Sequence, residues 1–148
     1  KKVASGAKRV GVIYSPGEAN SVAIVEALRK AATAAGLSLV EAAAARTVDV
    51  PSAAQSLVGK VDVIYAPTDN NVMSAFEGIV KVAQQARLPL VAADTDAVKR
   101  GAVAALGLNY YDLGRQTGKE IDVLRDGRPT THVRQRSTTH EQRRINFT

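Results

Sequence analysis

Three short clusters of polar side chains follow apolar, β-favouring runs in this sequence. Carboxylates in such clusters could bind an ammonium group or another cation, and free backbone amides at the start of a helix could bind a carboxylate. Together they would suit an amino-acid zwitterion. The candidate binding residues are Ser15, Glu18, Asn20 and Ser21 in the first cluster, Thr68, Asp69 and Asn70 in the second, and Asp94 in the third.

Each cluster also has a purely structural explanation. Asn, Ser, Thr and Asp are the residues that cap helices and form turns, so one cluster alone would favour that explanation. Ligands of parallel α/β proteins, however, bind at the carboxyl ends of the strands, where loops and helix starts meet. Three clusters in that position favour a binding site over three unrelated caps.

Other chemistries find less support in the residues. The turn SPGEAN has neither G-x-G-x-x-G nor a phosphate-binding lysine, and no acidic pair that could hold magnesium follows the first strand. His132 and His140 lack partners at metal-ligand spacing, and Ser21 has no His or Lys base at a motif spacing. We therefore predict no cofactor, no metal and no catalytic residue. The alternative is a regulatory or metal-dependent enzyme domain that uses Asp69 and Asp94.

The net charge of +6 is concentrated at the two ends of the 148-residue chain. Residues 1–9 carry four basic and no acidic side chains, and residues 125–148 carry six arginines against two acids. Because residues 10–124 hold 10 basic and 12 acidic side chains, we do not expect nucleic-acid binding. The absence of cysteine excludes disulfides and thiolate metal sites but fits either cytoplasm or periplasm.

Apolar strands alternate with amphipathic helices along the chain, which predicts a single α/β lobe. Strands are expected at 9–14, 37–44, 61–67, 88–93 and 102–108, and helices at 20–35, 51–58 and 70–85. This order favours a doubly wound, mainly parallel five-stranded sheet with helices on both faces. The apolar character of the first strand is typical of one that is covered on both sides. We expect Asn20 or Ser21 to cap the first helix and Asn70 or Asn71 to cap the third.

A last helix is expected over residues 111–125. Apolar or small side chains share one face there, namely Leu113, Thr117, Ile121 and Leu124. The following residues, 131–148, show little hydrophobic periodicity. We expect them to be extended, partly as an edge strand.

Four segments, in order, resemble the tryptophan/tyrosine-type substrate-binding proteins of ABC importers. They are KRVGVIYSPGEANSV, AAQSLVGKVDVIYAPTDN, LPLVAADTDAVKRGAVAALG and NYYDLGRQTGK. The resemblance runs from about Lys8 to Phe147 and covers about half of the family's length. It implies one lobe, the C-terminal one, of a type I periplasmic binding protein. By the same resemblance, the candidate binding residues above would face the ligand.

The resemblance also implies a function and a place for the last helix. A small solute, such as an aromatic amino acid, would be captured in the cleft between two lobes and delivered to an ABC permease. The protein would be periplasmic or extracytoplasmic, with or without a lipid anchor.

Residues 110–130 would cross the hinge and pack on the first lobe, and residues 131–148 would return. In this chain we expect that helix to pack on its own lobe or to be exchanged in a homodimer, since burying about three apolar side chains contributes on the order of 5 kcal/mol.

Overall fold

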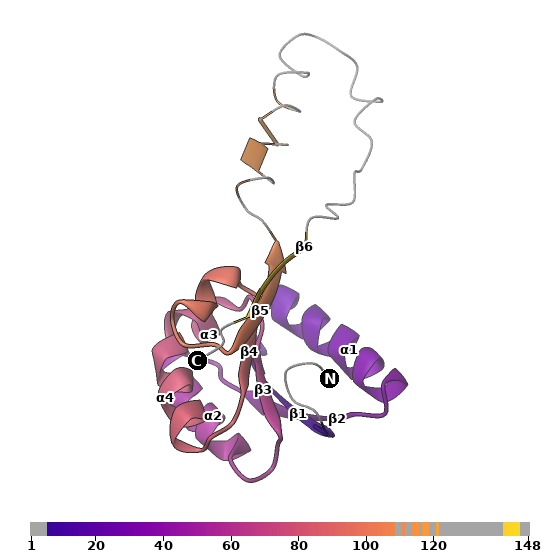
Figure 1. Cartoon of the computed structure of the whole chain (residues 1–148), viewed down its shortest axis with the longest axis vertical. Helices are drawn as coiled ribbons and strands as arrows, with labels where there is room; N and C mark the ends of the chain where they lie inside the picture. Colours follow the sequence, from indigo (N-terminus) through magenta and orange to yellow (C-terminus); the bar gives the residue numbers. More distant parts are fainter. Residues whose placement is uncertain are drawn as a thin grey trace.

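The computed structural model describes residues 6–108, the backbone of 141–145 and six positions between them, 111, 114, 115, 117, 118 and 121. A twisted sheet with helices packed on it makes up the lobe (Figure 1). The strands are β1 (Arg9–Tyr14), β2 (Ser38–Ala43), β3 (Val63–Ala66), β4 (Leu90–Ala92), β5 (Ala104–Leu108) and β6 (Glu141–Ile145). The α-helices are α1 (Ala19–Ala34), α2 (Val50–Leu57), α3 (Asn70–Ser74) and α4 (Phe76–Gln85), with short 3-10 helices η1 (Thr47–Asp49) and η2 (Thr95–Val98).

The sheet has the strand order β2-β1-β3-β4-β5-β6. The first five of these strands in space are parallel, as the sequence predicts, and the doubly wound α/β fold is confirmed. β6 is a sixth strand that runs antiparallel to β5, with Leu106 opposite Arg143. Its residues, EQRRI, have no alternating apolar pattern. Backbone hydrogen bonds, which almost any sequence can make, account for this pairing.

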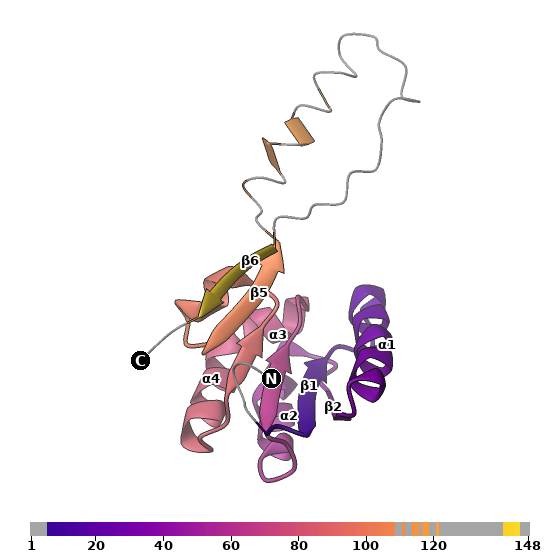
Figure 2. The same cartoon turned by 45° about the vertical axis from the view of Figure 1, so that its right-hand side comes forward.

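The strand order reverses between β1 and β3. The chain first steps outward from β1 to β2 through α1, then returns past β1 to β3 through α2. Right-handed crossovers therefore place α1 on one face of the sheet and α2 and α4 on the other (Figures 1 and 2). The carboxyl ends of β1 and β3 lie on either side of this switch point, where ligands of such sheets bind.

The main core lies between the sheet and the α2–α4 layer. Its largest side chains are fully buried, including Ile13, Ile64, Phe76, Ile79 and Leu90. β1 and α2 approach closely at Gly11, where an added Cβ would lie 2.9 Å from Cδ1 of Leu57. This packing gives the loops at the switch point a rigid base.

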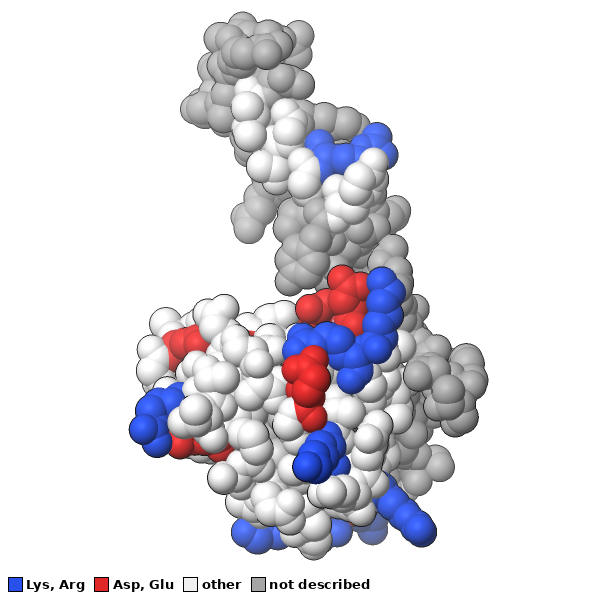
Figure 3. Space-filling model, turned by 90° about the vertical axis from the view of Figure 1, so that its left-hand side faces the viewer, with Lys and Arg blue, Asp and Glu red and all other residues white. Residues whose placement is uncertain are grey.

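The single helix expected over 70–85 is two helices, because the chain breaks at Ala75 (φ −111°, ψ 24°). Arg100 accounts for the break. Its Nη2 donates to the Met73 carbonyl at 2.9 Å, and its guanidinium binds Glu77 and lies 4.9 Å from the centre of the Phe76 ring. Acidic and basic side chains are interleaved on this face of the lobe (Figure 3).

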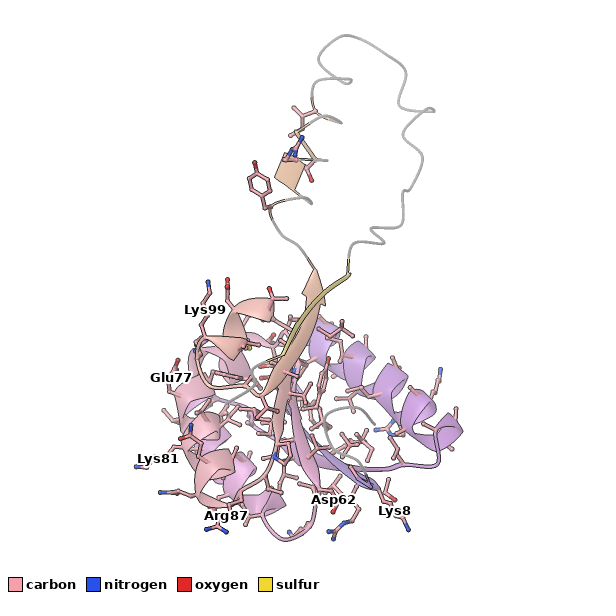
Figure 4. The ribbon with its side chains drawn as sticks, in the orientation of Figure 1. Lys8, Asp62, Glu77, Lys81, Arg87 and Lys99 are labelled. Atoms are coloured by element: carbon pink, nitrogen blue, oxygen red, sulfur yellow. The ribbon has the colours of Figure 1, made fainter. Side chains whose placement is uncertain are left out.

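The end of α4 has an unusual residue. Arg87 has a φ of 53°, and the amide of Leu88 donates to the Ala83 carbonyl at 2.8 Å, which closes the helix. Gly36 takes the same place after α1, with a φ of 68°. Glycine is favoured in such a cap because a side chain is strained in the left-handed region. In Figure 4, Arg87 lies along the lower edge of the lobe, as Asp62 and Lys8 do.

We expect Arg87→Gly to raise the free energy of unfolding by about 1 kcal/mol, because it relieves this strain. Urea unfolding followed by circular dichroism measures the change. Gly36→Ala is the reciprocal control and should lower stability by a similar amount. Equal stability of Arg87→Gly and the wild type would show that the left-handed backbone costs nothing here.

The described residues of the expected last helix have helical backbone but do not pack on the lobe. Tyr111 is 73% exposed and Ile121 is 58% exposed. Their segment stands beyond the carboxyl ends of the strands (orange in Figure 2). For these residues, the expected packing on their own lobe is not observed. The rest of 109–140, including Leu113, Leu124, His132 and His140, lies outside the described residues.

Candidate ligand-binding site

A buried carboxylate, Asp69, organises the switch point. It follows β3 and is fully buried. Its Oδ1 accepts hydrogen bonds from the Ser15 hydroxyl and the Val72 amide, both at 2.9 Å. Its Oδ2 accepts from the Ser15 amide at 2.7 Å and from the Ser21 hydroxyl. One side chain thus joins the loop after β1, the first turn of α1 and the start of α3.

These hydrogen bonds keep Asp69 charged. Burial by itself raises the pKa of the carboxyl group, but the donors Ser21, Val72 and Ser15 outweigh it, and the net pKa lies below the ordinary value. Four bonds saturate the two carboxylate oxygens. The sequence interpretation placed Asp69 among the ligand-facing carboxylates, whereas the structure directs its oxygens to protein donors. Asp69 is therefore a positioning residue.

Two bridges join the same loops closer to the solvent. The Asn70 side chain donates to Oε2 of Glu18 at 3.1 Å, and the Asn70 amide reaches the same oxygen at 3.4 Å. The Asn20 side chain donates to the Thr68 carbonyl at 3.4 Å. Glu18 is half-buried, while Asn20, Thr68 and Asn70 are exposed. These four residues form the solvent-facing part of the site.

A fourth segment, not anticipated from the sequence, joins the site through Asn71. Its Nδ2 donates to the Ser15 hydroxyl at 2.9 Å and to the Ala45 carbonyl at 3.3 Å. Its Oδ1 accepts from the Thr47 hydroxyl at 2.8 Å. The residues after β2 could have been considered from the sequence, because β2 also ends at this edge. Ala44 and Ala45 separate β2 from Arg46, Thr47 and Asp49, however, and these polar residues were not recognised as a fourth cluster.

The helix caps differ from those expected, because the side chains are used elsewhere. Glu18 is the N-cap residue of α1, and its side chain makes no capping bond. Asn20 and Ser21 turn to Thr68 and Asp69 instead. The N-cap of α3 is Asp69, not Asn70 or Asn71. The first-turn amides of α1 therefore face the site without a side-chain cap, and the helix dipole adds partial positive charge there.

Asp94 lies at the same edge, after β4, which pairs with β3. It is half-buried and caps η2, accepting the Asp96 amide at 2.9 Å. Gly107 of β5 lies close by, since a Cβ there would stand 2.3 Å from the Ala93 carbonyl oxygen. Within the described part of the chain, no hydrogen bond joins Asp94 to the Asp69 cluster. Ser21, Asp69 and Asp94 nevertheless lie at the same edge of the sheet, at the carboxyl ends of the strands, as the sequence predicts.

The parallel sheet, the reversal of strand order and the polar residues at the reversal point define a class: a doubly wound α/β lobe with polar side chains at the edge where such sheets bind ligands. Comparison with known proteins narrows this class. A family model described as "ABC transporter substrate binding protein" matches residues 1–148. The chain belongs to this family of substrate-binding proteins.

The relatives include a tyrosine-binding protein of Clostridioides difficile strain R20291. It is 38% identical over 125 residues, which are 84% of this chain and 36% of that protein. A conserved domain protein from Vibrio cholerae has a solved structure that is 40% identical, with a TM-score of 0.89 over 98% of this chain and 49% of the other.

The ABC domain from Streptococcus pneumonia in complex with L-Trp has a solved structure that is 29% identical, with a TM-score of 0.85. The match covers 97% of this chain and 50% of the other. The chain thus spans about half the length of these structures and about a third of the curated relative.

Proposed function

We propose that this chain is the C-terminal binding lobe of a solute receptor for an ABC importer, and that the solute is an amino acid with an aromatic side chain. The observation that carries the proposal is the buried Asp69 cluster, which joins the loop after β1, the first turn of α1 and the start of α3 at the switch point. The tyrosine-binding relative and the structure in complex with L-Trp support the choice of ligand.

The lobe binds without catalysis. The uncapped first turn of α1 receives the carboxylate of the amino acid, because its amides carry partial positive charge. Glu18 and Asp94 receive the ammonium group, and Asn20, Thr68 and Asn70 supply further hydrogen bonds. Ser15, Ser21 and Asp69 hold these groups in place. Among the residues that the structure describes, no three His, Cys, Asp or Glu side chains are grouped as metal ligands would be.

The wider role follows from the family. ABC substrate-binding proteins are extracytoplasmic, and delivery of the solute to a permease is part of the proposal, as is closure of a second lobe over the ligand. A lipid anchor would be compatible with this role. No helix in the described residues is long and apolar enough to cross a membrane.

An NMR titration of the 15N-labelled chain with L-tyrosine and L-tryptophan tests the proposal. We expect the amides of residues 18–21, 69–71 and 94–96 to shift, with a dissociation constant on the order of millimolar because one lobe contacts one side of the ligand. Glu18→Gln should weaken binding roughly tenfold, since it removes a charge-assisted bond.

Glu26→Gln, on an exposed position of the same helix, is the matched control and should change nothing. The enzyme alternative predicts a different result: magnesium alone would shift the amides near Asp94 and raise the melting temperature. We expect neither. Shifts spread evenly over the lobe, or equal affinity of Glu18→Gln and Glu26→Gln, would contradict the proposed site.

A further inference from the structure

Asp94 lies in the candidate site without a direct bond to its other residues. Within the part of the chain that the structure describes, no hydrogen bond joins Asp94 to Glu18 or to the Asp69 cluster. The register of β3 with β4 ends at Ala66 and Ala92, before either loop begins. Because Glu18 and Asp94 are proposed to receive one ammonium group, a contact outside the site is needed to hold the Asp94 turn relative to α3.

Arg100 makes such a contact. It follows η2, the short helix that Asp94 caps, and its side chain reaches the junction of α3 and α4. Its Nε and Nη2 donate to the two carboxylate oxygens of Glu77 at 2.7 and 3.0 Å. Its Nη2 also donates to the Met73 carbonyl at 2.9 Å, and the guanidinium lies 4.9 Å from the centre of the Phe76 ring. We call these contacts the Arg100 clamp.

The segment between Asp94 and Arg100 is short and closely bonded. The Ala97 amide donates to the Asp94 carbonyl, and the Arg100 amide donates to the Ala97 carbonyl, both at 3.1 Å. Ala97 is fully buried in the main core. An added Cβ at Gly101 would lie 2.7 Å from Cγ1 of Val80, so the chain after Arg100 lies directly on α4. The position of the clamp is therefore transmitted to the Asp94 turn.

Charge links the two side chains as well. The pKa of Arg100 is raised, chiefly by its hydrogen bond with Glu77, and the charges of Glu77 and Asp94 add to this shift against the effect of burial. The Arg100 side chain is 33% exposed. Solvent therefore screens its interactions less than those of a fully exposed arginine.

We propose that Arg100 is a positioning residue of the ligand-binding site, where its clamp on the α3–α4 junction keeps Asp94 aligned with Glu18. The Asn70 side chain, at the start of α3, completes the link because it donates to Glu18 at 3.1 Å. Arginine suits this position, since its planar fork can bind a carboxylate with two bonds and stack on a ring at the same time. The effect on binding rests on the proposed function, whereas the clamp itself does not.

Amide hydrogen exchange of the ligand-free chain tests the clamp by itself. Arg100→Gln should raise the exchange rates of the 96–97 amides, which bond to Asp94, by roughly tenfold or more. Arg29→Gln is the matched control and should leave these rates unchanged. Arg29 binds Glu41 through the same two nitrogens, at 3.1 and 2.7 Å, but joins α1 to β2.

Two exchange results would overturn the clamp. One is an equal rate at 96–97 in Arg100→Gln and Arg29→Gln. The other is an equal rise in the amides of β1, which report global unfolding and should keep their rates if the effect is local.

Arg100→Lys separates the clamp from the charge. Lysine keeps the positive charge but cannot form the fork and the ring contact together. We expect the 96–97 amides of Arg100→Lys to exchange as they do in Arg100→Gln. Exchange at the wild-type rate would show that a charge at this position is enough and that no clamp is needed.

A titration with L-tryptophan tests the consequence for the site. Arg100→Gln should weaken binding about fivefold, and Arg29→Gln should not. In an Asp94→Asn background, Arg100→Gln should cost less than about twofold more, because the charge that it aligns is already gone. An equal loss in both backgrounds would refute action through Asp94. A wild-type chain that binds no aromatic amino acid would contradict the proposed function, and hydrogen exchange would still decide the clamp.

Discussion

Asp69→Ala should lower the free energy of unfolding by about 3 to 5 kcal/mol. The change leaves four buried donors without their acceptor: the amides of Ser15 and Val72 and the hydroxyls of Ser15 and Ser21. The hydroxyls can rotate toward other oxygens, whereas the amides are fixed by the backbone. Urea unfolding followed by circular dichroism measures the loss.

The control for this substitution is an exposed aspartate at the same edge. The Asp96 side chain, in η2, is 70% exposed and forms a salt bridge with Lys99, the residue after η2, so Asp96→Ala should cost less than about 1 kcal/mol. If Asp69→Ala were no more costly than Asp96→Ala, the buried cluster would not be what holds the loops of the site together.

The pH dependence of stability gives the same test a second readout. Because the pKa of Asp69 is lowered in the folded protein, its contribution is present above the pKa of an unfolded aspartate, about 4, and is lost as the pH falls through the folded value. The pKa of Asp62 is also lowered, chiefly by its hydrogen bond with Arg9. The stability of the wild type therefore depends on more than one acid-sensitive group.

The difference in the free energy of unfolding between the wild type and Asp69→Asn isolates the contribution of the Asp69 charge. This difference should be constant near neutral pH and should shrink below about pH 4. A difference that does not change with pH would mean that Asp69 is not charged in the folded lobe.

Gly107→Ala is expected to have the second largest effect. The new Cβ would lie 2.3 Å from the Ala93 carbonyl oxygen and 3.4 Å from Cα of Asp94. Backbone atoms cannot rotate away as a flexible side chain does, so β4 and β5 must move apart. We expect a loss of about 2 to 3 kcal/mol and a displacement of Asp94.

Two measurements separate these effects. Urea unfolding reports the stability, and the amide shifts of residues 94–96 report the position of the loop. Gly17→Ala is the matched control, because nothing lies within 4 Å of its added Cβ, and it should change stability by less than about 0.5 kcal/mol. If Gly107→Ala were as stable as Gly17→Ala, with unshifted amides, β5 would not constrain the Asp94 loop.

Local sequence patterns account for much of this lobe. β1 was predicted with its observed bounds, and the cores of the other four parallel strands and of α1 and α2 were also recognised, because apolar periodicity depends on residues that are close in the sequence. For the same reason, the sequence alone assigns the polar segments after β1, β3 and β4 to one edge of a parallel sheet.

The partners of the polar side chains were decided by the tertiary structure alone. Asp69 could be read as a ligand carboxylate, a metal ligand or a cap, and its partners Ser15 and Ser21 lie 54 and 48 residues away in the chain. Asn71 reaches Ser15 over 56 residues, and Arg100 breaks the α3–α4 helix from 27 residues away, at Met73. Periodicity describes which face of an element is apolar. Which donor meets which acceptor depends on how the elements pack, and no local pattern contains that information.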